Sequence, residues 1–176
     1  MNIQNKKAFS MIELVFVIVI IGILASVAIP KLSATRDDAI ISKAKTLVAS
    51  IRNALAMERQ KRILRGEFNA LSAVGGNKDS SGNTYVFGHF FDDNGTKTDY
   101  SDDIDTGVSV MEYPILSEPN TKDKWSFTAP TATTRARYTF NSTLGDVIFE
   151  VVDGKFICDS SKTANTNDDG CKQLTR

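Results

Sequence analysis

The longest apolar stretch of the chain runs from Phe9 to Ile29, and nearly all of its 21 residues are apolar. As an α-helix, a stretch of this length extends about 31 Å, which matches the hydrocarbon thickness of a bilayer. Lys6 and Lys7 stand directly before it. Because positive charge favours the cytoplasmic side of a membrane, we expect the N-terminus inside and everything after Pro30 outside.

A helical pattern continues beyond Pro30. Apolar residues recur there at spacings of three and four and form one stripe, made of Ile40, Ala44, Leu47, Ile51 and Leu55. The pattern ends near Arg65, where Gly66 is suited to a C-cap. Pro30 has no amide hydrogen to donate, so it is expected to kink the helix or to melt it locally. If it is continuous, the helix over residues 9–65 is roughly 85 Å long.

After Gly66 the pattern changes to short apolar runs separated by polar turns. The runs 84–91, 108–116 and 137–141 are typical of strands. The clearest unit is residues 146–158, where Asp153-Gly154 forms a tight-turn pair between two apolar runs. Strands that follow a long helix predict an α+β fold with an antiparallel sheet packed on the helix. Trp125 and Phe127 are expected in the core between helix and sheet.

Charge is unevenly distributed, although the net charge is zero. Residues 31–67 carry nine Lys or Arg against four Asp or Glu, a net charge of +5, and residues 68–176 carry ten against sixteen, a net charge of −6. Such an imbalance favours attraction between copies of the chain, but an ordinary solvated surface has the same pattern. The basic run 58–65 lacks a base-reading motif, so a solvated or subunit-contacting face is favoured over nucleic-acid binding.

The two cysteines, Cys158 and Cys171, flank a polar segment near the C-terminus. A disulfide across this loop stabilises a fold by about 3 kcal/mol in the chain-entropy model, and it requires an oxidising compartment. Two reduced thiols are the alternative. The membrane topology and the disulfide independently place residues after Pro30 outside the cytoplasm.

Glu13 is the one charged residue inside the apolar stretch, and three interpretations of it compete. In a cleaved secretory signal peptide, the sequence SVA at 26–28 would be the processing site, but an acidic residue is unusual near the start. In a plain membrane anchor, Glu13 is tolerated near the interface. In the third interpretation Glu13 has a positive partner, because an ionisable residue in a membrane helix is costly when it is unpaired.

Residues 6–30, KKAFSMIELVFVIVIIGILASVAIP, resemble the class III leader and hydrophobic helix of type IV pilins and type II secretion pseudopilins. The resemblance covers about the first 35 residues. It implies that a prepilin peptidase cuts between Ala8 and Phe9 and methylates the new N-terminus. Glu13 then occupies the fifth mature position, and Pro30 matches the family's helix-kinking proline. A cut before Phe9 would place a new N-terminal amine one helical turn from Glu13, where the amine of the same chain or of a neighbouring subunit can pair with it. Ala8 departs from the family, in which glycine is usual at that position.

The resemblance also implies a domain organisation and a function. The expected parts are a leader at 1–8, a transmembrane and filament-core helix at 9–29, its amphipathic continuation at 30–66, and a β-rich globular domain at 67–176. The chain would be a structural subunit of a pilus-like filament or secretion pseudopilus, anchored in the inner membrane with its globular domain periplasmic. Its partners would be other pilins or pseudopilins, the prepilin peptidase, the inner-membrane assembly platform and lipid.

Two alternatives to that function stay open. Within the family, a competence pseudopilin would serve DNA uptake. Outside it, an exported soluble binding protein would discard the first 28 residues and begin at Ile29. No catalytic motif is present in the sequence, so an enzyme is not expected.

A calcium site is the one cofactor that the sequence suggests. Oxygen ligands alternate along residues 91–105, and the candidate ligands are Asp92, Asn94, Asp102 and Asp103. The EF-hand pattern is not met, because Lys97 stands where glycine is required. Calcium binding in a surface loop of secretion pseudopilins supports the idea, and a solvated loop without a metal is the alternative.

Overall fold

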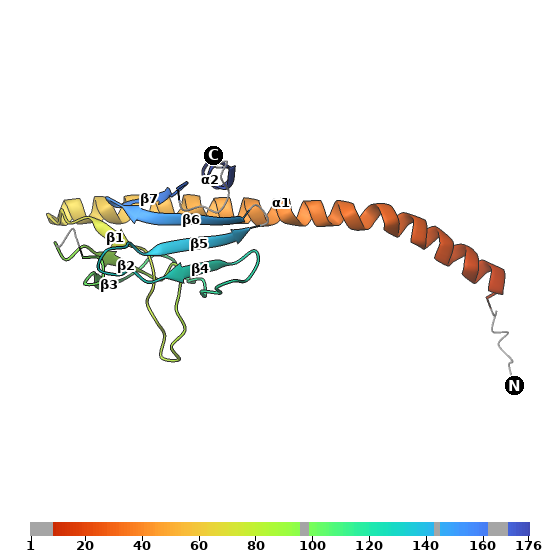
Figure 1. Ribbon diagram of the computed structural model, residues 1–176, viewed down its shortest axis with the longest axis horizontal. Coiled ribbons are helices and arrows are strands. Elements are labelled where there is room, and N and C mark those ends of the chain that lie inside the picture. Colours follow the sequence, from red (N-terminus) through yellow and green to blue (C-terminus); the bar gives the residue numbers. More distant parts are fainter. Residues whose placement is uncertain (1–8, 96–98, 143–144, 162–168) are drawn as a thin grey trace, which may run out of the picture. The chain divides into compact units, whose positions relative to one another are not determined.

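The computed structural model describes residues 9–95, 99–142, 145–161 and 169–176. Figure 1 shows a long N-terminal helix followed by antiparallel strands, so the α+β fold is confirmed. The elements are α1 (Met11–Arg65), β1 (Leu71–Ala73), β2 (His89–Asp92), β3 (Ile104–Ser109), β4 (Trp125–Thr128), β5 (Arg137–Ser142), β6 (Gly145–Val152), β7 (Lys155–Cys158) and α2 (Asp169–Thr175). The chain divides into two compact units, one up to Ala39 and one from Ile40 to Arg176.

Helix α1 is continuous on both sides of Pro30, so local melting at that residue does not occur. The helix ends where the sequence predicts. Gly66 adopts a positive φ of 82°, its amide donates to the Ile63 carbonyl at 3.0 Å, and the Glu67 amide donates to the Arg62 carbonyl at 2.9 Å. This pair of bonds is a Schellman motif, which satisfies two of the carbonyls left free at a helix end.

The strands form two antiparallel sheets. One has three strands in the order β1-β2-β3, and the other has four in the order β4-β5-β6-β7. The hairpin between β6 and β7 is confirmed: Asp153 and Gly154 have φ values of 50° and 70°, as a two-residue type I′ turn requires. The predicted strand at 137–141 is also confirmed as β5.

Two predicted strands are largely wrong. The run 84–91 forms a strand only from His89, and the run 108–116 loses its strand after Ser109. These runs still lie beside one another, since the Val86 amide donates to the Ile115 carbonyl at 2.8 Å and the Val110 amide to the Gly88 carbonyl at 2.7 Å. A turn at Val86 and Phe87, and bends at Glu112 and Tyr113 directly before Pro114, interrupt the strands, so isolated bridges replace a regular ladder.

The core of the second unit lies between α1 and the strands. The predicted helical stripe is buried at Ala44, Ile51 and Leu55, with Val48 added. Trp125 is buried as predicted, with its ring 5.2 Å from that of Phe87 and 5.1 Å from that of Phe140. The partly buried Phe127 packs at the margin of this core.

The buried stripe does not stop with its last apolar residue. One and two turns beyond Leu55, Glu58 and Arg62 are also buried, with 4% and 5% of their side chains exposed. Arg62 Nε lies 3.4 Å from Glu58 Oε1, and Arg62 Nη1 donates to Asp92 Oδ1 on β2. The favoured interpretation of the run 58–65 as a solvated or subunit-contacting face is therefore wrong for these two residues. An ion pair buried in this way requires a defined partner geometry, and here it joins the end of α1 to the three-stranded sheet.

Replacing Arg62 should destabilise the second unit. We expect Arg62→Ala to lower the free energy of unfolding by roughly 3 kcal/mol, because Glu58 and Asp92 lose a buried counter-ion while Arg65 still contacts Glu58. The measurement is chemical denaturation of the full-length chain in detergent. Arg59→Ala, on the exposed side of the same turn, is the control and should change the free energy of unfolding by less than about 0.5 kcal/mol. Equal losses in both variants would contradict the buried pair.

Candidate assembly site

The N-terminal turn of α1 positions Glu13. Ser10 precedes the helix, and its carbonyl accepts the first helical bond, from the Leu14 amide at 3.1 Å. Ser10 therefore stands at the N-cap and Glu13 at the third helical position, the spacing of a capping box. A carboxylate in a first helical turn also lies in the favourable field of the helix dipole. The sequence pattern Ser-x-x-Glu carried this signal, but the sequence interpretation of Glu13 did not use it.

The helix surface that follows is exposed among the residues that the structure describes. Side chains from Phe9 to Ser33 are exposed, apart from the half-buried Ala25. Large apolar side chains are among them, such as Phe9 with 81% and Leu24 with 65% of their surface exposed. This part of α1 is long and apolar enough to cross a membrane. Exposed apolar surface of this extent is stable only against lipid or against other apolar helices.

Polar groups inside the apolar segment are partly satisfied by the helix itself. The Ser26 hydroxyl donates to the Ile23 carbonyl at 2.7 Å, so it needs no partner from outside. Pro30 has no amide hydrogen, so the Ser26 carbonyl lacks its usual helical donor. Helices in lipid tolerate such a proline because neighbouring groups and local adjustments compensate for the missing bond.

Residues 3–29 match a family model described as the prokaryotic N-terminal methylation motif. The chain carries the class III prepilin-type signal of the type IV pilin and pseudopilin family. The match ends at Ile29, within α1. No curated protein and no solved structure matches the chain.

The prepilin signal agrees with the geometry of the apolar segment. The match includes Phe9 and Glu13, and the apolar helix beyond them fits a membrane-anchored pilin. Proteins with this signal assemble with other pilins and are processed by prepilin peptidase. Ala8, on the other side of the expected cut, lies outside the described residues. The roles of Ala8, Phe9, Glu13 and Pro30 stay predictions.

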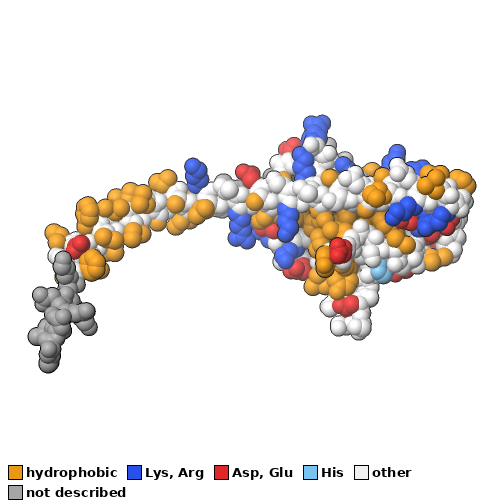
Figure 2. All heavy atoms as spheres, turned by 180° about the vertical axis from the view of Figure 1, so that it is seen from behind, with side chains coloured by type: hydrophobic (Ala, Val, Ile, Leu, Met, Phe, Trp, Pro, Cys, Tyr) orange, Lys and Arg blue, Asp and Glu red, His pale blue; other side chains and the backbone are white. Residues whose placement is uncertain are grey.

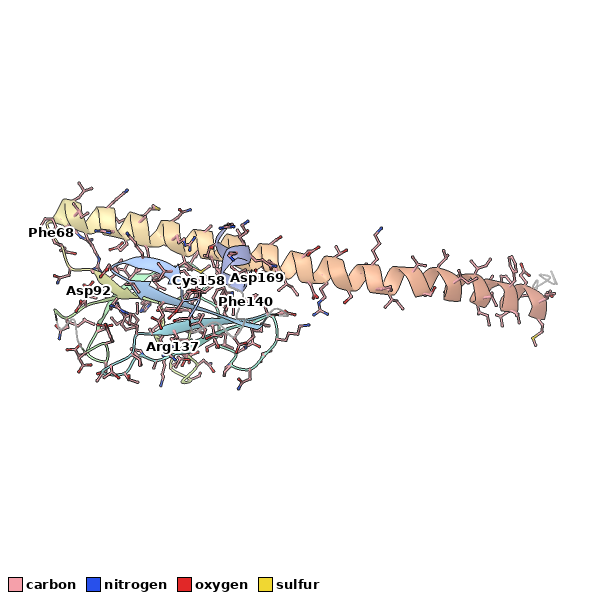
Figure 3. All side chains as sticks on the ribbon, turned by 45° about the horizontal axis from the view of Figure 1, so that its top comes forward. Phe68, Asp92, Arg137, Phe140, Cys158 and Asp169 are labelled. Carbon is pink, nitrogen blue, oxygen red and sulfur yellow. A yellow bond between two sulfur atoms is a disulfide. The ribbon has the colours of Figure 1, made fainter. Side chains whose placement is uncertain are left out.

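The disulfide between Cys158 and Cys171 is present, with 5.7 Å between the two Cα atoms. It joins the end of β7 to α2, and Figure 3 places Cys158 beside Asp169 at the start of that helix. Helix α2 is not predicted from the sequence, because it is only seven residues long and shows too little periodicity to be recognised. Cys171 and Leu174 are its buried apolar side chains, so the disulfide and one leucine hold the C-terminus on the sheet.

The calcium candidates are not arranged as one ligand set. Asp92 accepts a hydrogen bond from Arg62, which already neutralises it, and Figure 3 shows it below the end of α1. Asp103 is half-buried; burial and the neighbouring Asp93 and Asp102 carboxylates raise its pKa. Among the described residues, no group of three or more His, Cys, Asp or Glu is placed to hold a metal ion. Calcium binding by Asp92, Asn94, Asp102 and Asp103 therefore stays a prediction, with Asp92 already paired to a cation.

The single histidine has a structural partner. His89 Nδ1 lies 3.0 Å from Asp105 Oδ2, across the pairing between β2 and β3. About a third of the His89 side chain is exposed, 32%. This pair ties two neighbouring strands together.

Removing the disulfide should weaken the attachment of α2. We expect Cys158→Ala combined with Cys171→Ala to lower the free energy of unfolding by about 3 kcal/mol, since a loop of this length no longer restricts the unfolded chain. The measurement is denaturation of the full-length chain in detergent, with and without reductant. Reductant should destabilise the natural chain to a similar degree and leave the double variant unchanged. A natural chain that is insensitive to reductant after complete reduction would contradict this role.

Proposed function

We propose that this protein is a structural subunit of a type IV pilus-like filament or type II secretion pseudopilus. The observation that carries the proposal is the uncovered apolar segment of α1, which the methylation motif spans. In the membrane this surface contacts lipid, and in a filament it packs against the same segment of neighbouring subunits. One surface therefore serves both states, so a subunit leaves the membrane without exposing apolar side chains to water.

Processing between Ala8 and Phe9 creates the positive partner that Glu13 needs. The new α-amino group lies four residues before Glu13, about 6 Å along a helix axis. A free ammonium is unfavourable at the positive end of the helix dipole, and a lone carboxylate is unfavourable in lipid. Pairing the Phe9 amine of one subunit with Glu13 of its neighbour removes both penalties and fixes the stagger between adjacent helices.

Orientation follows from the charges around the helix. Lys6 and Lys7 hold the short N-terminus in the cytoplasm, where the prepilin peptidase and the assembly platform meet the subunit. The second unit then lies on the periplasmic side, and the disulfide between Cys158 and Cys171 fits an oxidising compartment.

The alternative of an exported soluble protein requires cleavage after Ala28. That bond lies inside the continuous helix α1, within a segment that the methylation motif covers almost completely. The prepilin route needs a cut only before Phe9, where the described helix has not yet begun. The geometry therefore favours the retained helix.

The mass and first residue of the mature protein test the processing step. We expect intact and peptide mass spectrometry of the membrane fraction to give a chain that begins at Phe9 and is heavier by one methyl group. Without the prepilin peptidase, the chain should keep residues 1–8. A mature chain that begins at Ile29 and is recovered in the soluble fraction would overturn the proposal.

Glu13→Gln tests the assembly step. We expect this variant to insert and to be processed normally but to yield no sheared filaments, because the amide cannot neutralise the Phe9 ammonium of a neighbour. Asp38→Asn removes the same charge from an exposed position of α1 outside the apolar segment, so it is the matched control and should assemble normally. Normal filaments from Glu13→Gln would show that the carboxylate is not an assembly group.

A further inference from the structure

A groove of about 500 Å³ lies between α1 and the edge strand β7. Its apolar wall includes Ile63 from α1 and Ile157 from β7, with 48% and 40% of their surfaces exposed. Three basic side chains, Arg52, Arg59 and Lys155, also line it. The groove therefore combines exposed aliphatic surface with positive charge. Figure 2 shows Lys and Arg side chains along the same helix.

The free edge of β7 is partly closed by α1. Arg52 Nε donates to the Phe156 carbonyl at 3.1 Å, so this backbone acceptor is not available to a further strand. Charged side chains at a sheet edge commonly prevent strand addition in this way. A partner in the groove is therefore held by side-chain contacts, and it needs apolar groups together with negative charge.

The second unit carries a surface with the complementary properties at the edge strand β3. Ile104 and Val108 on this strand are 53% and 38% exposed. Three carboxylates accompany them, from Asp102, Asp103 and Asp105. Some of this charge already has a partner within the chain: Asp105 lies 3.0 Å from His89 Nδ1, and Asp103 lies near Ser72 and Arg135. The three carboxylates still outnumber the one arginine beside them, so the surface keeps a negative charge. We call this surface, Asp102 to Val108, the acidic edge.

We propose that the groove between α1 and β7 of one copy binds the acidic edge of a second copy. Aliphatic side chains meet on the two surfaces, with Arg52, Arg59 and Lys155 around one and Asp102, Asp103 and Asp105 around the other. Opposite charges of this kind fix which surfaces meet and exclude groove-to-groove contact, in which like charges would face one another. The inference rests on the proposed filament function, since it names the contact between the globular units of neighbouring subunits.

The two surfaces lie on different sides of the second unit. In Figure 1, β7 runs beside α1, whereas β3 is separated from α1 by β1 and β2. One copy therefore presents its groove to one neighbour and its acidic edge to another. Contacts between unlike surfaces generate rings or open helical arrays, in contrast to the closed dimer made by one self-complementary patch.

Few side chains contribute on each side, so the contact is weak between free molecules. Packing of the N-terminal helices raises the effective concentration of one globular unit near the next, which converts a weak contact into an intramolecular one. The groove and acidic edge therefore set how neighbouring globular units meet once the helices are together.

Cysteine cross-linking tests which surfaces meet. Ala56→Cys places a thiol in the groove, and Ser109→Cys places one at the end of the acidic edge; both positions are exposed. The two variants are made as full-length chains with different tags and are co-expressed in cells that contain the assembly machinery. After mild oxidation of membranes and sheared filaments, we expect a mixed dimer that contains both tags, and no dimer from either variant alone.

Other cross-linking results would overturn the proposal. A dimer from Ala56→Cys alone would mean that groove meets groove. Absence of the mixed dimer counts against the contact if Ala28→Cys, on the exposed helix, still forms dimers. If the Ala28→Cys dimer forms and the mixed dimer does not, the filament function stands and only this contact is wrong. If the Ala28→Cys dimer and the filaments are both lost, the proposed function fails, and this contact fails with it.

Charge reversal supplies the second test. Arg59→Glu in the groove partner, or Asp105→Lys in the edge partner, should lower the mixed-dimer yield by about two- to fivefold, as expected for losing one exposed ion pair. Combining the two reversed partners should restore the yield. Lys122→Glu, an exposed residue outside both surfaces, is the matched control and should have no effect. Thermal melting of each variant shows whether it is still folded. If both single variants are folded and the mixed-dimer yield is unchanged, the charge pairing is wrong.

Discussion

The apolar segment of α1 constrains everything else about this protein, because its side chains are exposed throughout the described part of the chain. Side chains are apolar on every face from Met11 to Ile29, apart from Glu13 and a few small residues. A helix with one apolar stripe can bury that stripe against a sheet. A helix with apolar residues on every face requires lipid or a bundle of similar helices. The chain divides into two units after Ala39, and the second unit contains the whole buried core.

Within one helix the sequence changes from one packing requirement to another. Beyond Ala39 only one stripe is buried, and it continues from Ala44 and Leu55 into Glu58 and Arg62. Apolar packing gives this interface its stability but tolerates small shifts along the helix, since neighbouring aliphatic groups are similar. A buried arginine that must reach both Glu58 and Asp92 tolerates far less, so the charged end of the stripe defines where the helix sits on the sheets.

Local sequence signals predicted α1, its end at Gly66, the β6–β7 hairpin and the disulfide, because each depends on residues close together in the chain or on one strong periodicity. The failures involve contacts between distant segments. From the sequence alone, Arg62 is expected at the surface. It pairs with Asp92 because the fold places β2, thirty residues later, against the end of α1. The run 108–116 has strand composition, but it contains Pro114. Near its end, the run pairs with residues 85 and 86 only through isolated contacts, so no regular ladder forms. The matched motif includes Phe9 and Glu13, and the contacts proposed for them are with other molecules, which a single chain does not show.

The two halves of the chain contribute different kinds of specificity to assembly. Apolar helix packing is similar for every subunit with this signal, and in the proposed assembly the pairing of an N-terminal amine with Glu13 sets only the axial stagger. Discrimination between partners then depends on the surface of the globular unit, where charges oppose wrong contacts as well as favouring right ones. The basic helix and the acidic strand region differ in sign within one chain. A chain with opposite charges on different surfaces favours contact between unlike surfaces, and repeated contacts of that kind give an array with distinct ends.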